Sequence, residues 1–268
     1  MPEAIQHRFD PYSSNGGSIL AIAGKDFAVV AGDTRQSEGY SIQSRYQKKV
    51  FPLTSKAILA VNGFAADGNN FVKRVKQRLE WYTHAHNKEM PIKSIARLIQ
   101  TMLYARRMFP YYVYNVLAGI EEDDGTGAVY SFDPVGSYER ETCRAAGAAQ
   151  SLLQPFLDNQ IYFRNHTPAP GQPPFDPSTH PLSTVLSILV DSFSSATERH
   201  IEVGDFLEGY VILSPGRTSD DLIGEGVKGV LPEGMTVEEQ DPEDLDVQSA
   251  VAGKGCRVFL VRKELKRD

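Results

Sequence analysis

Cysteine is scarce in this sequence. Its 268 residues include only two, Cys143 and Cys256, which lie far apart and in no spacing that binds a metal or forms a redox pair. Such usage suits a reducing compartment. We therefore expect both cysteines to lie in the core, and we expect no metal and no cofactor.

Long apolar runs and an excess of positive charge are also missing. No eighteen consecutive apolar residues occur, and residues 1–12 lack the basic start and apolar stretch of a secretory signal. With 28 basic against 34 acidic residues, the net charge is −6, which gives no footprint for nucleic acid or anionic lipid. We expect an intracellular protein without nucleic-acid or membrane partners.

What is present is the composition of an ordinary folded protein. Apolar residues make up 41% and charged residues 23% of the chain, as in soluble globular domains. A chain of this length can bury one large core, so the sequence predicts a single domain over residues 1–268.

Strand and helix signals alternate along the chain in groups. Apolar runs flanking turn residues predict a hairpin, and recurring apolar positions at helical spacing predict pairs of amphipathic helices. The predicted strands cover residues 19–23, 27–31, 40–50, 57–61, 111–118, 128–132, 207–213 and 258–261. The predicted helices begin near Asp67 and after Pro91 and cover residues 145–157 and 184–199.

Two segments have no regular pattern. Thr167 to Pro181 holds six prolines in fifteen residues, which excludes regular structure and predicts a surface loop. Arg217 to Lys254 holds ten acidic residues and predicts an exposed insertion. Helix pairs between groups of antiparallel strands favour an α+β fold, a four-layer α-β-β-α sandwich of two stacked antiparallel sheets.

Four segments resemble the β subunits of the proteasome: Asn15–Arg35, Phe109–Asn115, Gly127–Arg140 and Ser195–His200. Within the family, Gly127–Arg140 is similar to the subunit at the sixth ring position. The resemblance implies the N-terminal-nucleophile hydrolase fold, with residues 1–16 as an extended arm or short propeptide. It also implies a place in the 20S core among other α and β subunits, in a stacked four-ring complex of 28 subunits built with assembly chaperones, in cytoplasm and nucleus.

The same resemblance implies that catalysis is lost. Active members attack with an N-terminal threonine, whose position falls on Gly17, and glycine has no hydroxyl. The family's aspartate and lysine fall on Asp33 and Lys49, which we interpret mainly as a structural ion pair. Two supporting polar residues are replaced by His200 and Val203. A third, a serine, is replaced within residues 145–149. The sequence predicts a non-catalytic structural subunit.

Other interpretations remain open at this stage. Ser18 could serve as a substitute nucleophile after cleavage of the Gly17–Ser18 bond, although alternation along a strand would turn its hydroxyl away from Asp33. The acidic run 238–246 could make the chain a binding module for a basic partner. His84 and His86 lie two apart on a predicted helix, so they do not share a face and are not expected to bind metal.

Overall fold

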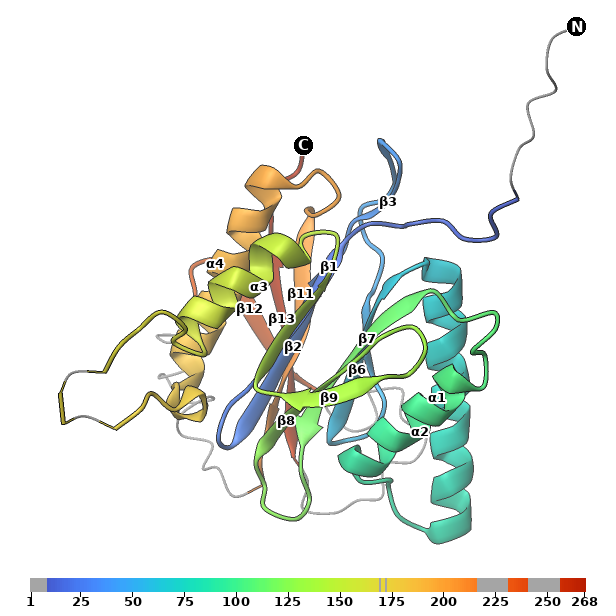
Figure 1. The fold of residues 1–268 in the computed structure, drawn as a ribbon, viewed down its shortest axis with the longest axis horizontal. Helices are drawn as coiled ribbons and strands as arrows, with labels where there is room; N and C mark the ends of the chain where they lie inside the picture. Colours follow the sequence, from blue (N-terminus) through green and yellow to red (C-terminus); the bar gives the residue numbers. More distant parts are fainter. Residues whose placement is uncertain (1–8, 169, 172, 216–230, 241–255) are drawn as a thin grey trace, which may run out of the picture.

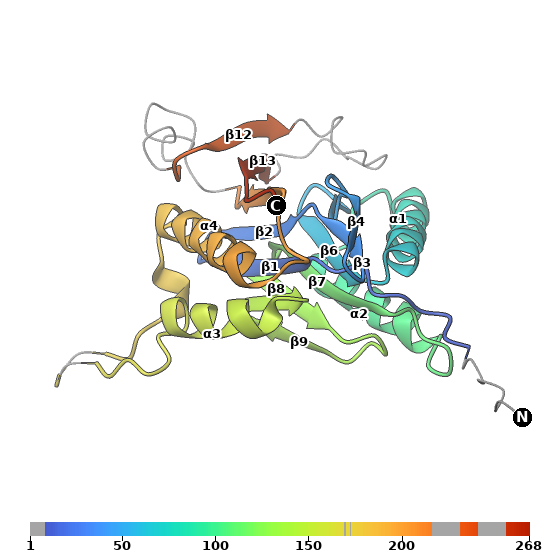
Figure 2. The ribbon, with the colours of Figure 1, turned by 90° about the horizontal axis from the view of Figure 1, so that it is seen from above.

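Two antiparallel sheets lie face to face, with a pair of helices on each outer side (Figures 1 and 2). The computed structural model describes residues 9–168, 170–171, 173–215, 231–240 and 256–268. This arrangement is the predicted four-layer α-β-β-α sandwich.

The first sheet has six strands in the order β10-β1-β2-β11-β13-β12. Every pair of neighbours is antiparallel. Its strands are β1 (Ser18–Ala23), β2 (Phe27–Asp33), β10 (Cys143–Gly147), β11 (Phe206–Leu213), β12 (Met235–Gln240) and β13 (Arg257–Glu264).

The second sheet has five strands in chain order, β5 to β9, and a separate hairpin joins β3 to β4. The five strands are β5 (Val50–Pro52), β6 (Ala57–Gly63), β7 (Val113–Ile120), β8 (Gly127–Phe132) and β9 (Tyr138–Glu141). The hairpin strands are β3 (Gln36–Glu38) and β4 (Ser41–Ser44).

The helices form the two outer layers. Helices α1 (Ala65–His86) and α2 (Ile92–Tyr104) cover the five-stranded sheet, whereas α3 (Gln150–Gln160) and α4 (Leu182–Arg199) cover the six-stranded sheet (Figure 2). The described residues also include one short 3-10 turn, η1 (Pro177–Thr179). Among the described residues, no helix is long and apolar enough to span a membrane.

Three buried apolar clusters fill the three spaces between the layers. The central cluster packs sheet against sheet through small and β-branched side chains such as Ile19, Val30 and Ile58. Because both faces of β1 and β2 are covered, every residue in these strands is buried. This double burial explains why their sequences are continuous apolar runs and do not alternate.

Several predicted elements need correction. Residues 145–157 are not one helix: β10 ends at Gly147, whose φ is +104°, and α3 begins at Gln150. Pairing of β10 with β1 outweighs the helical preference of its alanines. Residues 40–50 form parts of β4 and β5 with an irregular segment between them.

The two segments without a pattern are more ordered in places than predicted. Within Thr167–Pro181 the described residues are mostly exposed, as expected, but Asp176 caps the short turn η1 through its contact with Ser178 N. Within Arg217–Lys254, residues 235–240 form the edge strand β12 against β13, a strand that the sequence did not predict. The remainder of that segment, residues 217–230 and 241–254, lies outside the described residues, as does the first half of the predicted arm, residues 1–8.

Candidate functional site around Gly17

Gly17 lies at the entrance to β1 in a conformation that favours glycine. Its φ is +71°, in the left-handed region. Its N–H donates to the carbonyl of Glu202 at 3.0 Å, and its carbonyl accepts from Ala148 N at 2.9 Å. A Cβ atom at this position would lie 2.5 Å from Lys49 Nζ and closer still to Lys49 Cε. The Lys49 side chain therefore fills the space that a side chain at position 17 would need.

Asp33 and Lys49 are brought together beside Gly17, as the sequence predicts. Lys49 Nζ lies 3.3 Å from Asp33 Oδ1 and donates to the carbonyls of Asp33 and Arg35 at 2.7 and 2.6 Å. The Asp33 carboxylate also accepts from Ser18 N at 2.7 Å and from Gly204 N at 3.2 Å. Both side chains are buried together with these hydrogen-bond partners. The pair therefore links the end of β2 to the residues just before β5 and to the turn before β11.

Burial acts on the charge of both groups. It raises the pKa of the Asp33 carboxyl, against the lowering effects of Lys49 and of the N–H groups of Ser18 and Gly204. It lowers the pKa of the Lys49 ammonium, against the raising effect of Asp33. Each group thus stabilises the ionised form of the other in an environment from which water is excluded.

Ser18 points its hydroxyl toward the start of α3. Its Oγ accepts from Ala149 N at 2.8 Å, and the residue is fully buried. Only its backbone N–H faces Asp33. The Ser18 side chain thus points away from Asp33, as the alternation of side chains along a strand predicts. In this conformation its hydroxyl accepts a hydrogen bond from Ala149 N.

His200 and Val203 lie in the turn that follows α4, but their side chains do not complete the site. His200 Nδ1 accepts from Glu202 N at 3.3 Å, and Val203 is buried in the core under α4. Among the described residues, the contacts from this turn to Gly17 and Asp33 come from the backbones of Glu202 and Gly204. The sequence offered no signal for these two backbone contacts beyond the presence of a glycine.

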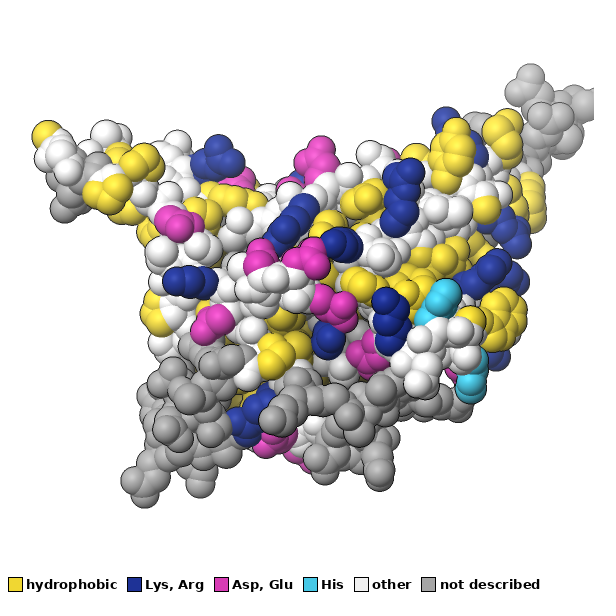
Figure 3. All heavy atoms as spheres, turned by 90° about the horizontal axis from the view of Figure 1, so that it is seen from below, with side chains coloured by type: hydrophobic (Ala, Val, Ile, Leu, Met, Phe, Trp, Pro, Cys, Tyr) yellow, Lys and Arg dark blue, Asp and Glu magenta, His cyan; other side chains and the backbone are white. Residues whose placement is uncertain are grey.

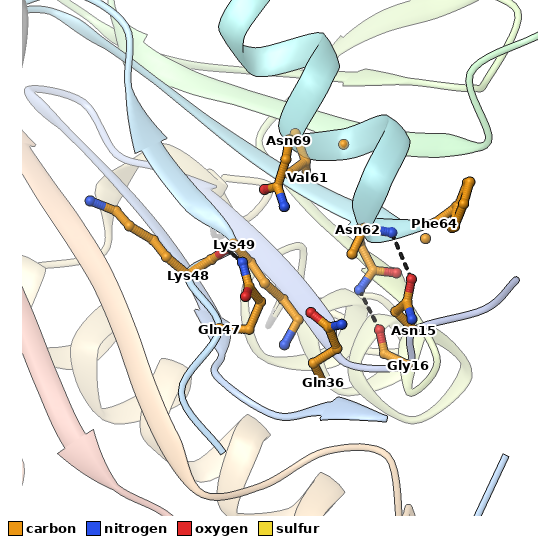
Figure 4. Close-up of a pocket in the computed structure, with 13 residues that line it drawn as sticks. Asn15, Gly16, Gln36, Gln47, Lys48, Lys49, Val61, Asn62, Phe64 and Asn69 are labelled. Carbon is orange, nitrogen blue, oxygen red and sulfur yellow. Dashed lines mark hydrogen bonds between the residues drawn. The ribbon is translucent and has the colours of Figure 1, made fainter. Parts of the chain in front are cut away.

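The arm before Gly17 crosses the site, which the sequence did not predict. Asn15 N donates to the Gly63 carbonyl at 3.2 Å, and the Asn15 carbonyl accepts from Ser37 N at 3.0 Å. The Asn15 amide oxygen accepts from Ala65 N at 2.8 Å, at the start of α1. Asn62 Nδ2 donates to the Gly16 carbonyl at 2.9 Å, as Figure 4 shows. The arm therefore joins β3, the end of β6 and α1.

An aromatic anchor holds the arm farther from the site. Tyr12 Oη donates to the Pro110 carbonyl at 2.7 Å. The Tyr12 ring packs on Phe109 and Tyr112, with centroids 5.6 and 5.3 Å apart. Residues 12–16 thus have fixed contacts at both ends.

The hollow beside Lys49 is small. Asn15, Gly16, Gln36, Lys49 and Asn62 are among its lining residues (Figure 4), and its volume is about 30 Å³. Such a volume holds about one or two water molecules.

A network of ion pairs stabilises the turn after α4. The sequence did not predict this network. Asp205 is fully buried with φ +70° and accepts from Arg35 Nε at 2.8 Å and from Arg45 Nη1 at 2.5 Å. Arg35 Nη1 donates to the Ile201 carbonyl at 2.8 Å, and Arg35 reaches Asp268 Oδ1 at 3.4 Å. Arg35 belongs to the quoted motif, but its partners lie more than 160 positions away.

Among the described residues, no three His, Cys, Asp or Glu side chains are grouped so that they could hold a metal ion. His84 and His86 are exposed near the end of α1, and His86 packs on Tyr82.

Comparison with known proteins gives a consistent assignment. Residues 13–169 match the family model described as proteasome subunit. Proteasome subunit beta type-6 of Saccharomyces cerevisiae is 54% identical over 223 residues, covering 79% of this chain and 89% of that protein. Proteasome subunit beta type-1 of Danio rerio is 46% identical, covering 79% and 86%. The protein of the same name in Arabidopsis thaliana is 44% identical, covering 79% and 94%. With its sandwich of the N-terminal-nucleophile hydrolase class, this chain belongs to the family of proteasome β subunits.

Proposed function

We propose that this chain is a non-catalytic structural β subunit of the 20S proteasome core, which contributes to protein breakdown by ring assembly and by walling the proteolytic chamber. One observation carries the proposal: Gly17, which the resemblance aligns with the family's nucleophile, has no side chain, and the Lys49 side chain fills the space where one would lie. Acyl transfer needs a hydroxyl or thiol beside a base, and position 17 supplies neither.

The course of the arm supports the same role. An extended peptide binds a cleft by pairing its backbone with exposed strand edges. Here Asn15 of the chain itself bonds Ser37 N and the Gly63 carbonyl. A substrate segment would have to displace Asn15 from both partners, together with the Tyr12 anchor.

The family assignment supports assembly with other α and β subunits. We propose a stacked four-ring complex of 28 subunits, reached with the help of assembly chaperones, in cytoplasm and nucleus. Imaging of the fluorescently tagged chain tests the location, and a signal confined to one of the two compartments would contradict it.

One observation favours the second candidate, an active protease that uses Ser18. Cleavage of the Gly17–Ser18 bond would leave the new amine where Ser18 N now meets Asp33 Oδ1 at 2.7 Å. The hydroxyl would still have to leave Ala149 N and turn to the other side of β1. The first proposal requires no such rearrangement.

Mass spectrometry of the mature chain, isolated within its native complex, separates the two candidates. We expect an N-terminus at or before Gly16, together with co-purifying α and β subunits. A mature chain that begins at Ser18 would support the protease, and a chain that purifies without other proteasome subunits would contradict both candidates.

A further inference from the structure

Two asparagine residues of this chain, Asn15 and Asn62, are followed directly by glycine. In such a pair the glycine nitrogen can attack the side-chain carbon Cγ of the asparagine and close a five-membered ring, because glycine has no side chain to obstruct the approach. Both residues lie at the Gly17 site, where Asn62 Nδ2 donates to the Gly16 carbonyl (Figure 4). Their surroundings differ in the groups that ring closure uses.

The backbone nitrogen of Gly16 is the nucleophile for ring closure at Asn15, and its N–H has no hydrogen-bond partner among the described residues. Gly16 is nevertheless buried. Buried N–H groups are almost always paired, and the next two along the chain are: Gly17 N donates to the Glu202 carbonyl and Ser18 N to Asp33 Oδ1. The Gly16 nitrogen can therefore react without first losing a hydrogen bond.

The side-chain carbonyl of Asn15 is polarised by helix α1. Its Oδ1 accepts from the N–H of Ala65, the first residue of that helix, at 2.8 Å. The N-terminus of a helix is positive, and a backbone N–H aimed at a carbonyl oxygen stabilises the negative charge that develops there when the carbon is attacked. The amide nitrogen Nδ2, which must leave, has one longer bond, to Gln43 Oε1 at 3.3 Å.

Asn62 lacks this arrangement. It lies within β6, where its backbone pairs with Tyr114 of β7. Its Nδ2 donates to the Gly16 carbonyl at 2.9 Å, but no donor in the described ranges reaches its Oδ1. The chain thus contains the same Asn-Gly pair in two settings, and only Asn15 has a donor on its side-chain oxygen.

We propose that Asn15 is a site of spontaneous deamidation in the folded chain, promoted by the Ala65 N–H. The Gly16 nitrogen forms a bond to Asn15 Cγ, the Cγ–Nδ2 bond breaks, and ammonia leaves with the proton of the Gly16 N–H. One water molecule then opens the succinimide ring. Its addition at Cγ gives aspartate, and its addition at the backbone carbonyl carbon gives isoaspartate. The hollow that Asn15 and Gly16 help to line can hold this water.

The two products act differently on the arm. Aspartate leaves the main chain unchanged, and its carboxylate can still accept from Ala65 N, where a negative charge is favoured. Isoaspartate adds one atom to the main chain between positions 15 and 16. It therefore shifts the backbone bonds of residue 15 to Ser37 and Gly63 relative to the bond between Gly16 and Asn62.

Either product changes the net charge of the chain from −6 to −7. On the face of the molecule in Figure 3, Lys and Arg lie beside Asp and Glu, so one more surface charge there would have neighbours of both signs. Position 15 is instead buried, next to the start of α1. The modification therefore acts on the arm and on α1, whether or not the chain is catalytic.

Mapping of isoaspartate in the native complex tests the site. The purified complex is kept at pH 8, and aspartate and isoaspartate at both asparagines are followed by mass spectrometry and by labelling with protein isoaspartate methyltransferase. We expect Asn15 to react at least about fivefold faster than Asn62. In urea, where these contacts are lost, the two should react at about the same rate. Equal rates in the native complex, an Asn15 that stays intact while the unfolded chain reacts, or a mature chain without Asn15 would overturn the proposal.

Ala65→Pro isolates the contribution of the helix donor. Proline has no N–H and is favoured at the first position of a helix, and Phe64 before it is already extended, with ψ 108°. In the assembled complex, loss of the donor should slow the reaction of Asn15 at least about threefold and leave that of Asn62 unchanged. An unchanged rate at Asn15, or a faster one as expected if the bond only restrains the side chain, would overturn the proposal.

Discussion

Gly17 has no side chain, and its surroundings disfavour one. Its φ of +71° and the adjacent Lys49 side chain both disfavour any other residue there. A threonine at this position would require Lys49 to leave its carbonyl partners on Asp33 and Arg35.

Gly17→Ala should be clearly destabilising. The left-handed conformation costs a non-glycine residue about 1–2 kcal/mol. Displacing Lys49 from its buried hydrogen bonds adds about 1–3 kcal/mol. Urea unfolding of the purified chain measures the total.

Gly39→Ala is the matched control for this substitution. Gly39 also has a positive φ, +58°, but no atom lies within 4 Å of its Cβ position. Only the conformational cost should appear. Equal losses for the two variants would show that Lys49 does not fill position 17.

Cys143 gives the folded chain a weakness at high pH. Burial raises the pKa of its thiol from 9.0 to about 12. Above pH 9 the thiol ionises in the unfolded chain first, so the stability that it contributes at lower pH is lost progressively between pH 9 and 12. The expected loss is about 1.4 kcal/mol per pH unit from this group.

Unfolding measured across pH 8–11 in parallel with Cys143→Ala checks this loss. At pH 8 the variant is less stable because of its smaller side chain, but it should lose less stability per pH unit. The same alkaline slope in both proteins would show that the Cys143 thiol is not responsible.

Residue-level prediction succeeded where a motif fixes the neighbours. Gly17 and Asp33 fall within the quoted segment Asn15–Arg35, Lys49 lies outside it, and the structure brings the three together. Asn15 lies in the same segment, but its partners Ser37, Gly63 and Ala65 come from other elements. Such contacts depend on tertiary placement, which no local pattern encodes.

At the scale of elements, Asn15 of the arm caps the N-terminus of helix α1. The residue before the helix, Phe64, has no side chain that can cap it, and Asn15 supplies the acceptor for Ala65 N from fifty positions away. The arm thus takes the place of a local N-cap.

Asn15→Ala should loosen the first turn of α1. Loss of an N-cap acceptor costs about 1 kcal/mol, which raises the hydrogen-exchange rate of the Ala65 amide several-fold. Asn70→Ala on the same helix is the control, since its side chain bonds only the exposed Arg74. An unchanged hydrogen-exchange rate of the Ala65 amide in the Asn15→Ala variant would show that the arm does not stabilise α1.

Element prediction failed mainly where composition and pairing disagree. The alanines of residues 145–149 favour a helix, yet hydrogen bonding to β1 draws residues 143–147 into a strand. In the same way, the acidic residues of 235–240 suggest an exposed loop, although pairing with β13 makes them an edge strand whose side chains are largely exposed. Strand partners are distant in sequence, so composition alone could not reveal either pairing.

At the scale of the whole molecule, layer order was predictable because double burial and helical periodicity are strong signals. The sandwich places the site around Gly17 at one end of β1.

The central claim is that this chain carries no nucleophile. The most direct measurement treats the native complex with a peptide electrophile that reacts with N-terminal hydroxyl nucleophiles and maps the adducts by mass spectrometry. We expect adducts on other subunits and none on this chain, because Gly17 has no hydroxyl and Ser18 Oγ is bonded to Ala149 N. An adduct on Ser18 would contradict the claim and identify the chain as an active protease.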